Sequence, residues 1–316
     1  MFRSLCYILT FVFILSGNIF SKQVYLSLIR EIPLESTPYD IIVYDDYAYI
    51  LTGGNIYSFK PSDPNAITIT TYAVEGGASS LAFTGRYAYT TGNFDGINYF
   101  DFTKTPPVLK NTIRTSGPLG KIVIDNGYLY TLNKSLGLQV YDVNTADFPS
   151  YRNTQILPGD ANGMYVRDKK AYITTTNANL SIIDIGDVSR LSVVGSYNYG
   201  VTFLEPYVDG NYAFIPQGAS GVQVIDITKL PFPEWIANIF ARKSAKQVVS
   251  SNFFVWVTDE YTVEGFYNIT EKSFLYAGNY NNKNTGINKI MLYEGKYIYL
   301  LSADKKLKVL KIDYKV

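Results

Sequence analysis

Short runs of alternating aromatic and aliphatic residues recur along this chain, each directly after a polar turn. The first is DDYAYI at residues 45–50, and GRYAYT, NGYLYT, GNYAFI and GKYIYL follow. Every second side chain of a run is aromatic, which is the period of a β-strand and not of a helix. Asn-Gly and similar polar pairs are typical of the tight turns of β-hairpins. The pattern therefore predicts hairpins at regular intervals.

The second aromatic residue of each run gives the length of the repeat. It recurs in steps of 40, 41, 42, 42, 42 and 43 residues, at Tyr49, Tyr89, Tyr130, Tyr172, Phe214, Trp256 and Tyr299. Each unit also has an apolar run before the turn, a third apolar segment such as LQVYD (138–142) and a looser fourth one. Four short strands in each of seven units predict an all-β fold, a seven-bladed β-propeller with four-stranded antiparallel blades.

The aromatic runs are expected to pack adjacent blades together. Each blade of a propeller contacts two neighbours, so its central strands must be apolar on both faces. We interpret Tyr47 and Tyr49 as blade-to-blade packing and Ala48 as the space that a neighbouring blade fills.

The two ends of the chain predict how the ring closes. The last unit ends after its third strand, LKVLKID, whereas VYLSLIREI (24–32) is an additional strand ahead of the first unit. We expect this N-terminal strand to complete the last blade, because a partial blade would leave an open edge. Residues 22–316 should then form a single propeller domain.

Residues 1–21 have the pattern of a secretory signal peptide. Arg3 is followed by the apolar run CYILTFVFIL and then by small residues, with cleavage expected after Ser21. The run is too short to span a bilayer comfortably, so we expect no membrane span in the mature chain; an uncleaved anchor is the alternative. The signal predicts export to the periplasm, the cell surface or the extracellular space.

Composition excludes several kinds of chemistry. The chain of 316 residues is 47% apolar and contains 29 tyrosines and 18 phenylalanines, which favours strands. Lys plus Arg number 28 against 27 Asp plus Glu, so no charge field would attract nucleic acid. Histidine is absent and the single cysteine, Cys6, lies in the signal. We therefore expect no Ser-His-Asp or Cys-His catalysis, no metal site and no cofactor.

The third strands carry a resemblance to a known family. LQVYD (138–142), LSIID (180–184), VQVID (222–226) and INYFD (97–101) resemble the LVIVD repeat, which forms propellers in secreted bacterial and archaeal surface proteins. The resemblance implies a secreted propeller without shared catalytic residues. Four units keep the terminal aspartate, and we interpret it as a cap for the following turn and not as a metal ligand. These residues are Asp101, Asp142, Asp184 and Asp226.

A largely polar column lies nine residues before each aromatic position. Its members are Asp40, Ser80, Lys121, Gly163, Glu205, Gln247 and Ile290, with Lys289 beside the last. These residues should begin the first strands, where loops meet at one mouth of the channel, and ligand sites favour such concave places. One hypothesis is a ligand-binding ring of Asp40, Lys121, Glu205 and Gln247. A solvated channel lining is the simpler alternative.

Aromatic residues in polar loops of the same face are further candidates for ligand contact. Rigid amphipathic rings in such loops can hold sugars or partner proteins. The candidates are Phe94 with the adjacent Asp95, Tyr199, Tyr261 and Tyr280. The segment 229–243, with Trp235, is expected to pack on the neighbouring blade or to form a protruding protein-binding patch.

These observations favour an exported binding or interaction protein without catalytic activity. We expect a monomer whose ligand is a protein or a carbohydrate and not a nucleic acid. The alternative is an extracellular carbohydrate-active hydrolase or lyase that uses the carboxylates at the channel mouth as acid and base.

Overall fold

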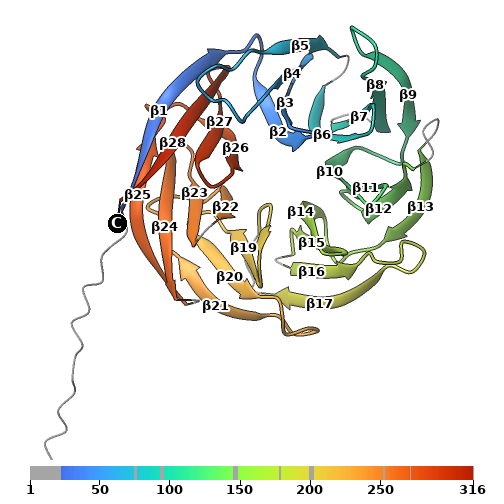
Figure 1. Ribbon diagram of the computed structural model, residues 1–316. Coiled ribbons are helices and arrows are strands. Elements are labelled where there is room, and N and C mark those ends of the chain that lie inside the picture. The colour runs from blue at the N-terminus through green and yellow to red at the C-terminus, as the bar shows by residue number, and fades with distance from the viewer. Residues whose placement is uncertain are drawn as a thin grey trace, which may run out of the picture.

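Seven four-stranded antiparallel sheets are arranged around a common axis (Figure 1). The computed structural model describes residues 23–315, except 75–76, 93–95, 145–148, 178, 199–202, 252 and 271. The first strand of each blade lies nearest the axis and the fourth lies at the rim. The predicted seven-bladed propeller is confirmed.

The blades are numbered here in chain order. Blades 1 and 2 consist of β2 (Pro38–Tyr44), β3 (Tyr47–Thr52), β4 (Asn55–Phe59), β5 (Thr70–Ala73), β6 (Ala78–Thr84), β7 (Tyr87–Gly92), β8 (Gly96–Asp101) and β9 (Val108–Arg114). Blades 3 and 4 consist of β10 (Leu119–Asp125), β11 (Tyr128–Asn133), β12 (Gly137–Asp142), β13 (Ser150–Gln155), β14 (Ala161–Arg167), β15 (Lys170–Thr175), β16 (Asn179–Asp184) and β17 (Ser192–Asn198). Blades 5 and 6 consist of β18 (Tyr207–Asp209), β19 (Tyr212–Pro216), β20 (Val222–Asp226), β21 (Glu234–Ile239), β22 (Gln247–Ser251), β23 (Phe254–Thr258), β24 (Thr262–Thr270) and β25 (Ser273–Asn281). Blade 7 consists of β26 (Ile287–Tyr293), β27 (Tyr297–Ser302), β28 (Lys306–Lys315) and the N-terminal β1 (Gln23–Pro33).

The N-terminal strand closes the ring, as predicted. β1 pairs with β28 from Gln23 opposite Lys315 to Pro33 opposite Lys306, and the two strands lie side by side in Figure 1. The buried Lys308 on β28 donates a hydrogen bond to Asn282 Oδ1 at 2.6 Å. Its Nζ also lies 3.5 Å from Glu31 Oε1 on β1. Polar pairing therefore accompanies the backbone ladder at the closure.

The aromatic runs pack between blades, with one correction. The ring centroid of Tyr49 lies 4.1 Å from that of Phe83 in blade 2, and the fully buried Ala48 faces the cluster of Tyr299 in blade 7. Tyr47 was expected to pack in the same way, but it is 37% exposed. It is the first residue after the turn, where its ring contacts the Lys60 ammonium at the surface, 5.4 Å from the ring centroid.

The recurrent aspartates cap turns, which confirms the structural interpretation. In every case Oδ1 accepts a hydrogen bond from the backbone N–H two residues later, at 2.8–2.9 Å. The pairs are Asp101 with Thr103, Asp142 with Asn144, Asp184 with Gly186, and Asp226 with Thr228.

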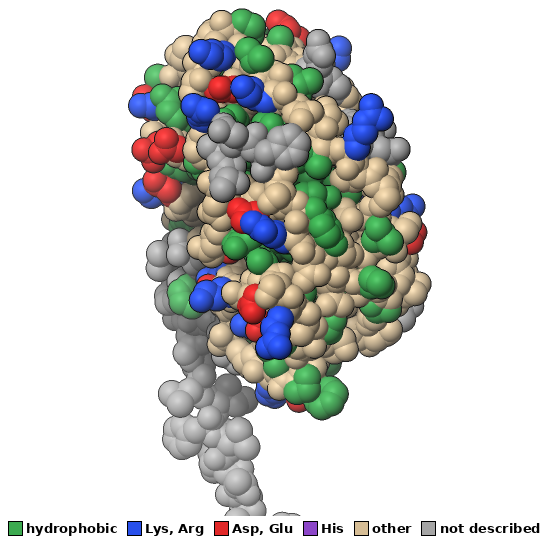
Figure 2. Space-filling view, turned by 90° about the vertical axis from the view of Figure 1, so that its right-hand side faces the viewer, with side chains coloured by type: hydrophobic (Ala, Val, Ile, Leu, Met, Phe, Trp, Pro, Cys, Tyr) green, Lys and Arg blue, Asp and Glu red, His purple; other side chains and the backbone are tan. Residues whose placement is uncertain are grey.

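The segment 229–243 both packs on a neighbour and presents aromatic side chains. A Cβ atom at Gly195 of β17 would lie 2.6 Å from Leu230 Cδ2, so the glycine makes room for this loop against blade 4. Trp235 and Phe232 remain exposed. On the part of the rim that Figure 2 shows, hydrophobic side chains stand in small groups between polar, acidic and basic ones.

Candidate functional site

The predicted polar column forms a ring at one end of the seven first strands. In five blades the ring position is opposite the residue two places after the aromatic anchor, as Asp40 is opposite Leu51. Lys121 lies within a shift of the pairing register, and Glu205 lies two residues before β18. In blade 7 this position belongs to Lys289, opposite Leu301, and not to Ile290. The reason is the turn, which spans three residues between Tyr293 and Tyr297 but two in the other hairpins. The ring therefore consists of Asp40, Ser80, Lys121, Gly163, Glu205, Gln247 and Lys289.

Two ring members use their polar atoms to fasten the next blade. Asp40 Oδ2 accepts hydrogen bonds from Ser80 Oγ at 3.1 Å and from the Leu81 N–H at 3.3 Å. Ser80 Oγ accepts one from the Ile122 N–H at 3.2 Å. Asp40 is only 3% exposed. Its carboxylate therefore serves the contact between blades 1 and 2.

Gln247 has a similar role on the other side of the ring. Its Oε1 accepts a hydrogen bond from the Ile290 N–H at 3.0 Å, and its Nε2 donates one to the Asn288 carbonyl. Asn288 Nδ2 in turn donates to the Pro38 carbonyl at 3.0 Å, which joins blade 7 to blade 1. The amide of Gln247 thus holds blades 6 and 7 together.

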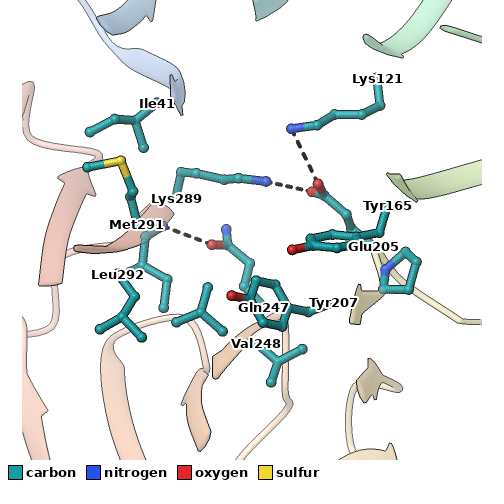
Figure 3. Close-up of a pocket in the computed structure, with 13 residues that line it drawn as sticks. Ile41, Lys121, Tyr165, Glu205, Tyr207, Gln247, Val248, Lys289, Met291 and Leu292 are labelled. Atoms are coloured by element: carbon teal, nitrogen blue, oxygen red, sulfur yellow. Dashed lines mark hydrogen bonds and ion pairs between the residues drawn. The ribbon is translucent and has the colours of Figure 1, made fainter. Parts of the chain in front are cut away.

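Glu205 has different partners, two lysine side chains from distant blades. Its Oε1 lies 3.3 Å from Lys121 Nζ, and its Oε2 accepts a hydrogen bond from Lys289 Nζ at 2.5 Å. Lys121 Nζ also lies 3.6 Å from Asp40 Oδ1. Figure 3 shows Lys121, Lys289 and Glu205 pointing toward one another across the channel. The side chain of Glu205 keeps 35% of its surface exposed.

Gly163 makes room for Glu205. A Cβ atom at Gly163 would lie 2.4 Å from Glu205 Cα, so any larger residue would displace the backbone there. Gly163, which has no side chain, thus lies next to Glu205, whose carboxylate reaches into the channel.

The surroundings keep these groups charged. Burial opposes ionisation of Glu205, but the charges of Lys121 and Lys289 outweigh it and lower the pKa of the carboxyl to about 2. Burial also opposes the charge of Lys121, and the Asp40 and Glu205 carboxylates outweigh it and raise the pKa of the ammonium. At neutral pH the centre of the ring is therefore a carboxylate between two ammonium groups.

Two cavities meet at the ring. The outer one, of about 390 Å³, is lined by ring members and by residues just before them in sequence, including Tyr39, Asn162, Lys246 and Asn288. The inner one, of about 230 Å³, is lined by residues that follow the ring positions, including Ile41, Tyr165, Tyr207, Val248, Met291 and Leu292. We call the inner cavity the channel chamber. The two cavities share Lys121, Glu205, Gln247 and Lys289.

Two tyrosines form one wall of the channel chamber. The ring centroids of Tyr165 and Tyr207 are 5.0 Å apart, and the Tyr207 hydroxyl donates a hydrogen bond to the Ser250 carbonyl at 3.2 Å. Burial raises the pKa of both phenols, so they are neutral at physiological pH. These tyrosines were not among the residues predicted from the sequence, although their positions in the repeat are distinctive. Both lie two residues after a ring position, where Ile42, Ala82, Val123, Val249 and Met291 stand in the other blades.

The other predicted contact residues are scattered. Tyr261 lies in the loop between β23 and β24, with the Lys243 ammonium 5.5 Å from its ring centroid, and Tyr280 on β25 packs against a core cluster. Within the described chain, the residues that line the two cavities do not include either tyrosine. Phe94, Asp95, Tyr199 and the predicted signal peptide lie outside the described residues.

Two further features concern the part of the chain that the structure describes. No three acidic side chains gather there in a way that could hold a metal ion. Nor does that part contain a helix long and apolar enough to cross a membrane.

Comparison with protein families agrees with the repeat seen in the third strands. A model of the LVIVD repeat matches residues 158–199 and 207–233, which carry most of blades 4 and 5. The protein is a seven-bladed β-propeller, and its blades 4 and 5 contain the LVIVD repeat. In these two blades β16 and β20 supply the motifs LSIID and VQVID.

A solved structure shows a similar fold. The computationally designed Ika8 protein is 9% identical in sequence, with a TM-score of 0.65 over 88% of this chain and 98% of its own. At that identity the likeness concerns the fold alone. No curated protein matches the sequence.

Proposed function

We propose that this propeller is an exported binding protein without catalytic activity, which takes a ligand at the ring around Glu205. The observation that carries the proposal is the carboxylate held between Lys121 and Lys289 at the entrance of a cavity. Asp40, Ser80 and Gln247 join neighbouring blades, whereas Glu205 and Lys289 bind each other across the channel. Partly buried charges are costly to keep, and charged groups gathered in a cleft are typical of functional sites.

The alternative, a carbohydrate-active enzyme, has less support from the geometry. Glycoside hydrolysis needs a protonated carboxyl as general acid beside a second carboxylate. Glu205, with a pKa of about 2, stays ionised at the pH where such an acid must give up a proton. The second carboxylate, Asp40, is buried and bonded to blade 2. The ammonium of Lys121 lies near both, at 3.3 and 3.6 Å.

The proposal of export rests on the sequence of residues 1–21. A charged start, a short apolar run and small residues are typical of a secretory signal. Sequencing the N-terminus of the protein recovered from its native host tests this part, and an intact Met1 would contradict a cleaved signal.

A binding screen with a product assay tests the site. Thermal-shift panels of small metabolites and a glycan array would be run on the wild type, on Glu205→Gln and on Glu234→Gln. Glu234 is an exposed glutamate on β21 that also pairs with a lysine, so it is the matched control. We expect ligand affinity to change in Glu205→Gln only, and mass spectrometry to find the ligand unchanged after incubation. A ligand whose binding is insensitive to Glu205→Gln, or a product that Glu205→Gln abolishes, would overturn the proposal.

A further inference from the structure

The channel chamber has the size of a single-ring molecule. Its volume is about 230 Å³, and a dry cavity of roughly 150 Å³ is enough to bind benzene. Drug-sized ligands occupy pockets of about 300 Å³ or more. The chamber therefore suits one ring or a short branched chain with a small head group, and not an oligosaccharide.

The walls of the chamber are mostly apolar. Met291 and Leu292 stand on one side, and Tyr165 and Tyr207 stand on the other, as Figure 3 shows. Val248 lies next to Tyr207. Met291 has a flexible thioether side chain that adapts to the shape of a ligand. Both phenols are neutral, so they present ring faces and uncharged hydroxyl groups. An apolar body fits between these walls.

The charged end of the chamber and the adjoining outer cavity together have one positive charge in excess, three lysines against the two carboxylates of Glu205 and Asp40. Lys289 pairs with Glu205 alone, whereas Lys121 lies between Glu205 and Asp40. An ammonium group has three N–H donors, and the hydrogen bond from Lys289 to Glu205 uses one of them. Lys246, the third of these lysines, lines the outer cavity. An anionic head group is thus favoured over a cationic one.

We infer that the channel chamber binds a small amphipathic carboxylate, with its apolar body between Val248, Met291 and Tyr207 and its carboxylate beside Lys289. This ligand class rests on the proposed function and narrows it. Binding places the carboxylate of the ligand next to Lys289 and close to the negative charge of Glu205. Removing the positive charge of Lys289 should therefore lower the affinity for the ligand, and removing the negative charge of Glu205 should raise it.

Calorimetric titration with 3-phenylpropionate tests the inference. We expect Lys289→Met to weaken binding about tenfold or more and Glu205→Gln to tighten it, because each changes one charge next to the bound carboxylate. Lys296→Met is the matched control, an exposed lysine at the other end of blade 7 that pairs with Glu294. It should leave affinity unchanged. Because the two channel variants act with opposite sign, a general loss of folding cannot imitate the result.

Two further ligands distinguish the contribution of the carboxylate from that of the apolar ring. Acetate carries the charge without the ring and should bind at least about tenfold more weakly, since burying a ring supplies most of the binding energy. The cation 3-phenylpropylamine should not compete. If the amine binds better, or if the two variants shift 3-phenylpropionate affinity in the reverse directions, the inference is wrong.

One further outcome distinguishes this inference from the proposed function. If 3-phenylpropionate does not bind while a glycan or another metabolite still responds to Glu205→Gln, the ligand class is wrong and the binding site at the ring stands. If no ligand of any class responds to Glu205→Gln, both are overturned.

Discussion

The Glu205 carboxylate is stabilised by two lysines, one 84 residues before it in the chain and one 84 residues after it. Lys121 and Lys289 arrive from blades 3 and 7, and Glu205 comes from blade 5. Each ammonium stabilises the carboxylate, and the carboxylate offsets the repulsion between the two ammonium groups. Gly163 makes the close approach of blades 4 and 5 possible.

The stability of the protein should depend on pH through Glu205. Its folded pKa of about 2 lies below the usual value of about 4.3 in an unfolded chain. The carboxylate therefore stabilises the fold above about pH 4.3, and this contribution is lost as pH falls toward 2. Glu205→Gln should lower the free energy of unfolding by about 1–2 kcal/mol at pH 7, a modest figure because solvent reaches the side chain.

Urea unfolding between pH 7 and pH 2.5 measures this effect. The difference between the wild type and Glu205→Gln should shrink steadily below pH 4.3. In the control Glu234→Gln the difference should stay within about 0.5 kcal/mol at every pH. A difference for Glu205→Gln that does not vary with pH would contradict the ion-pair interpretation.

The first strands place the ring side chains by means of β-bulges. In five blades the pairing register shifts immediately before or at the ring residue, for example between Pro38 and Asp40 and between Ile287 and Lys289. A bulge bends a strand and re-aims the side chain next to it. In these five blades the bulge directs the residue of the polar column toward the channel.

The ends of the third strands depend on the aspartate caps. Asp226 Oδ1 accepts hydrogen bonds from the Thr228 N–H at 2.9 Å and from Thr228 Oγ1 at 2.6 Å. We expect Asp226→Ala to lower the free energy of unfolding by about 1 kcal/mol, the usual net contribution of such bonds. Asp226→Asn should lose less because it keeps the acceptor.

Denaturant unfolding of both variants measures the cap, with Asp313→Ala as control. Asp313 is on β28, and its ion pair with Lys311 is exposed. Loss of this pair should therefore change the free energy of unfolding little. Ligand affinity at the ring should be unchanged in Asp226→Ala. Equal stability of Asp226→Ala and the wild type would mean that the recurrent aspartate has another role.

At the scale of the whole molecule, stability depends on closing the ring. β1 brings the buried Val24 into the contact between blades 6 and 7, and Leu34 just after it packs against blade 1. Leu26, Ile29 and Ile32 add partly buried surface, and each such side chain stabilises the fold by about 1–2 kcal/mol. Without β1 the edge of β28 would be open to pairing with other chains.

A chain that begins at Glu35 should therefore unfold at a clearly lower temperature than one that begins at Lys22. We expect a loss of several kcal/mol in the free energy of unfolding, seen as an earlier far-UV circular dichroism transition and as concentration-dependent association. The chain from Lys22 is the control, since it keeps β1. Equal transition temperatures for the two chains would show that the closure does not stabilise the ring.

Most of the architecture could be predicted from the sequence, because it depends on local periods and on counting. The alternation of aromatic and aliphatic residues identifies the strands, and the even spacing of the aromatic anchors predicts seven blades. The additional strand at residues 24–32 predicts how the ring closes. The polar column is visible for the same reason. The prediction that Tyr47 packs between blades was wrong, because the exposure of a side chain next to a turn depends on the neighbouring blade and not on the residue type.

Only the tertiary structure decided what each ring residue does. Asp40 and Glu205 are both acidic and occupy equivalent positions, yet one fastens a blade and the other reaches across the channel. Their roles differ because the partners come from other blades, and because a three-residue turn brings Lys289 and not Ile290 to the ring. The sequence by itself determined a propeller with a polar channel mouth. Contacts between residues far apart in the chain decided where a carboxylate and two ammonium groups meet.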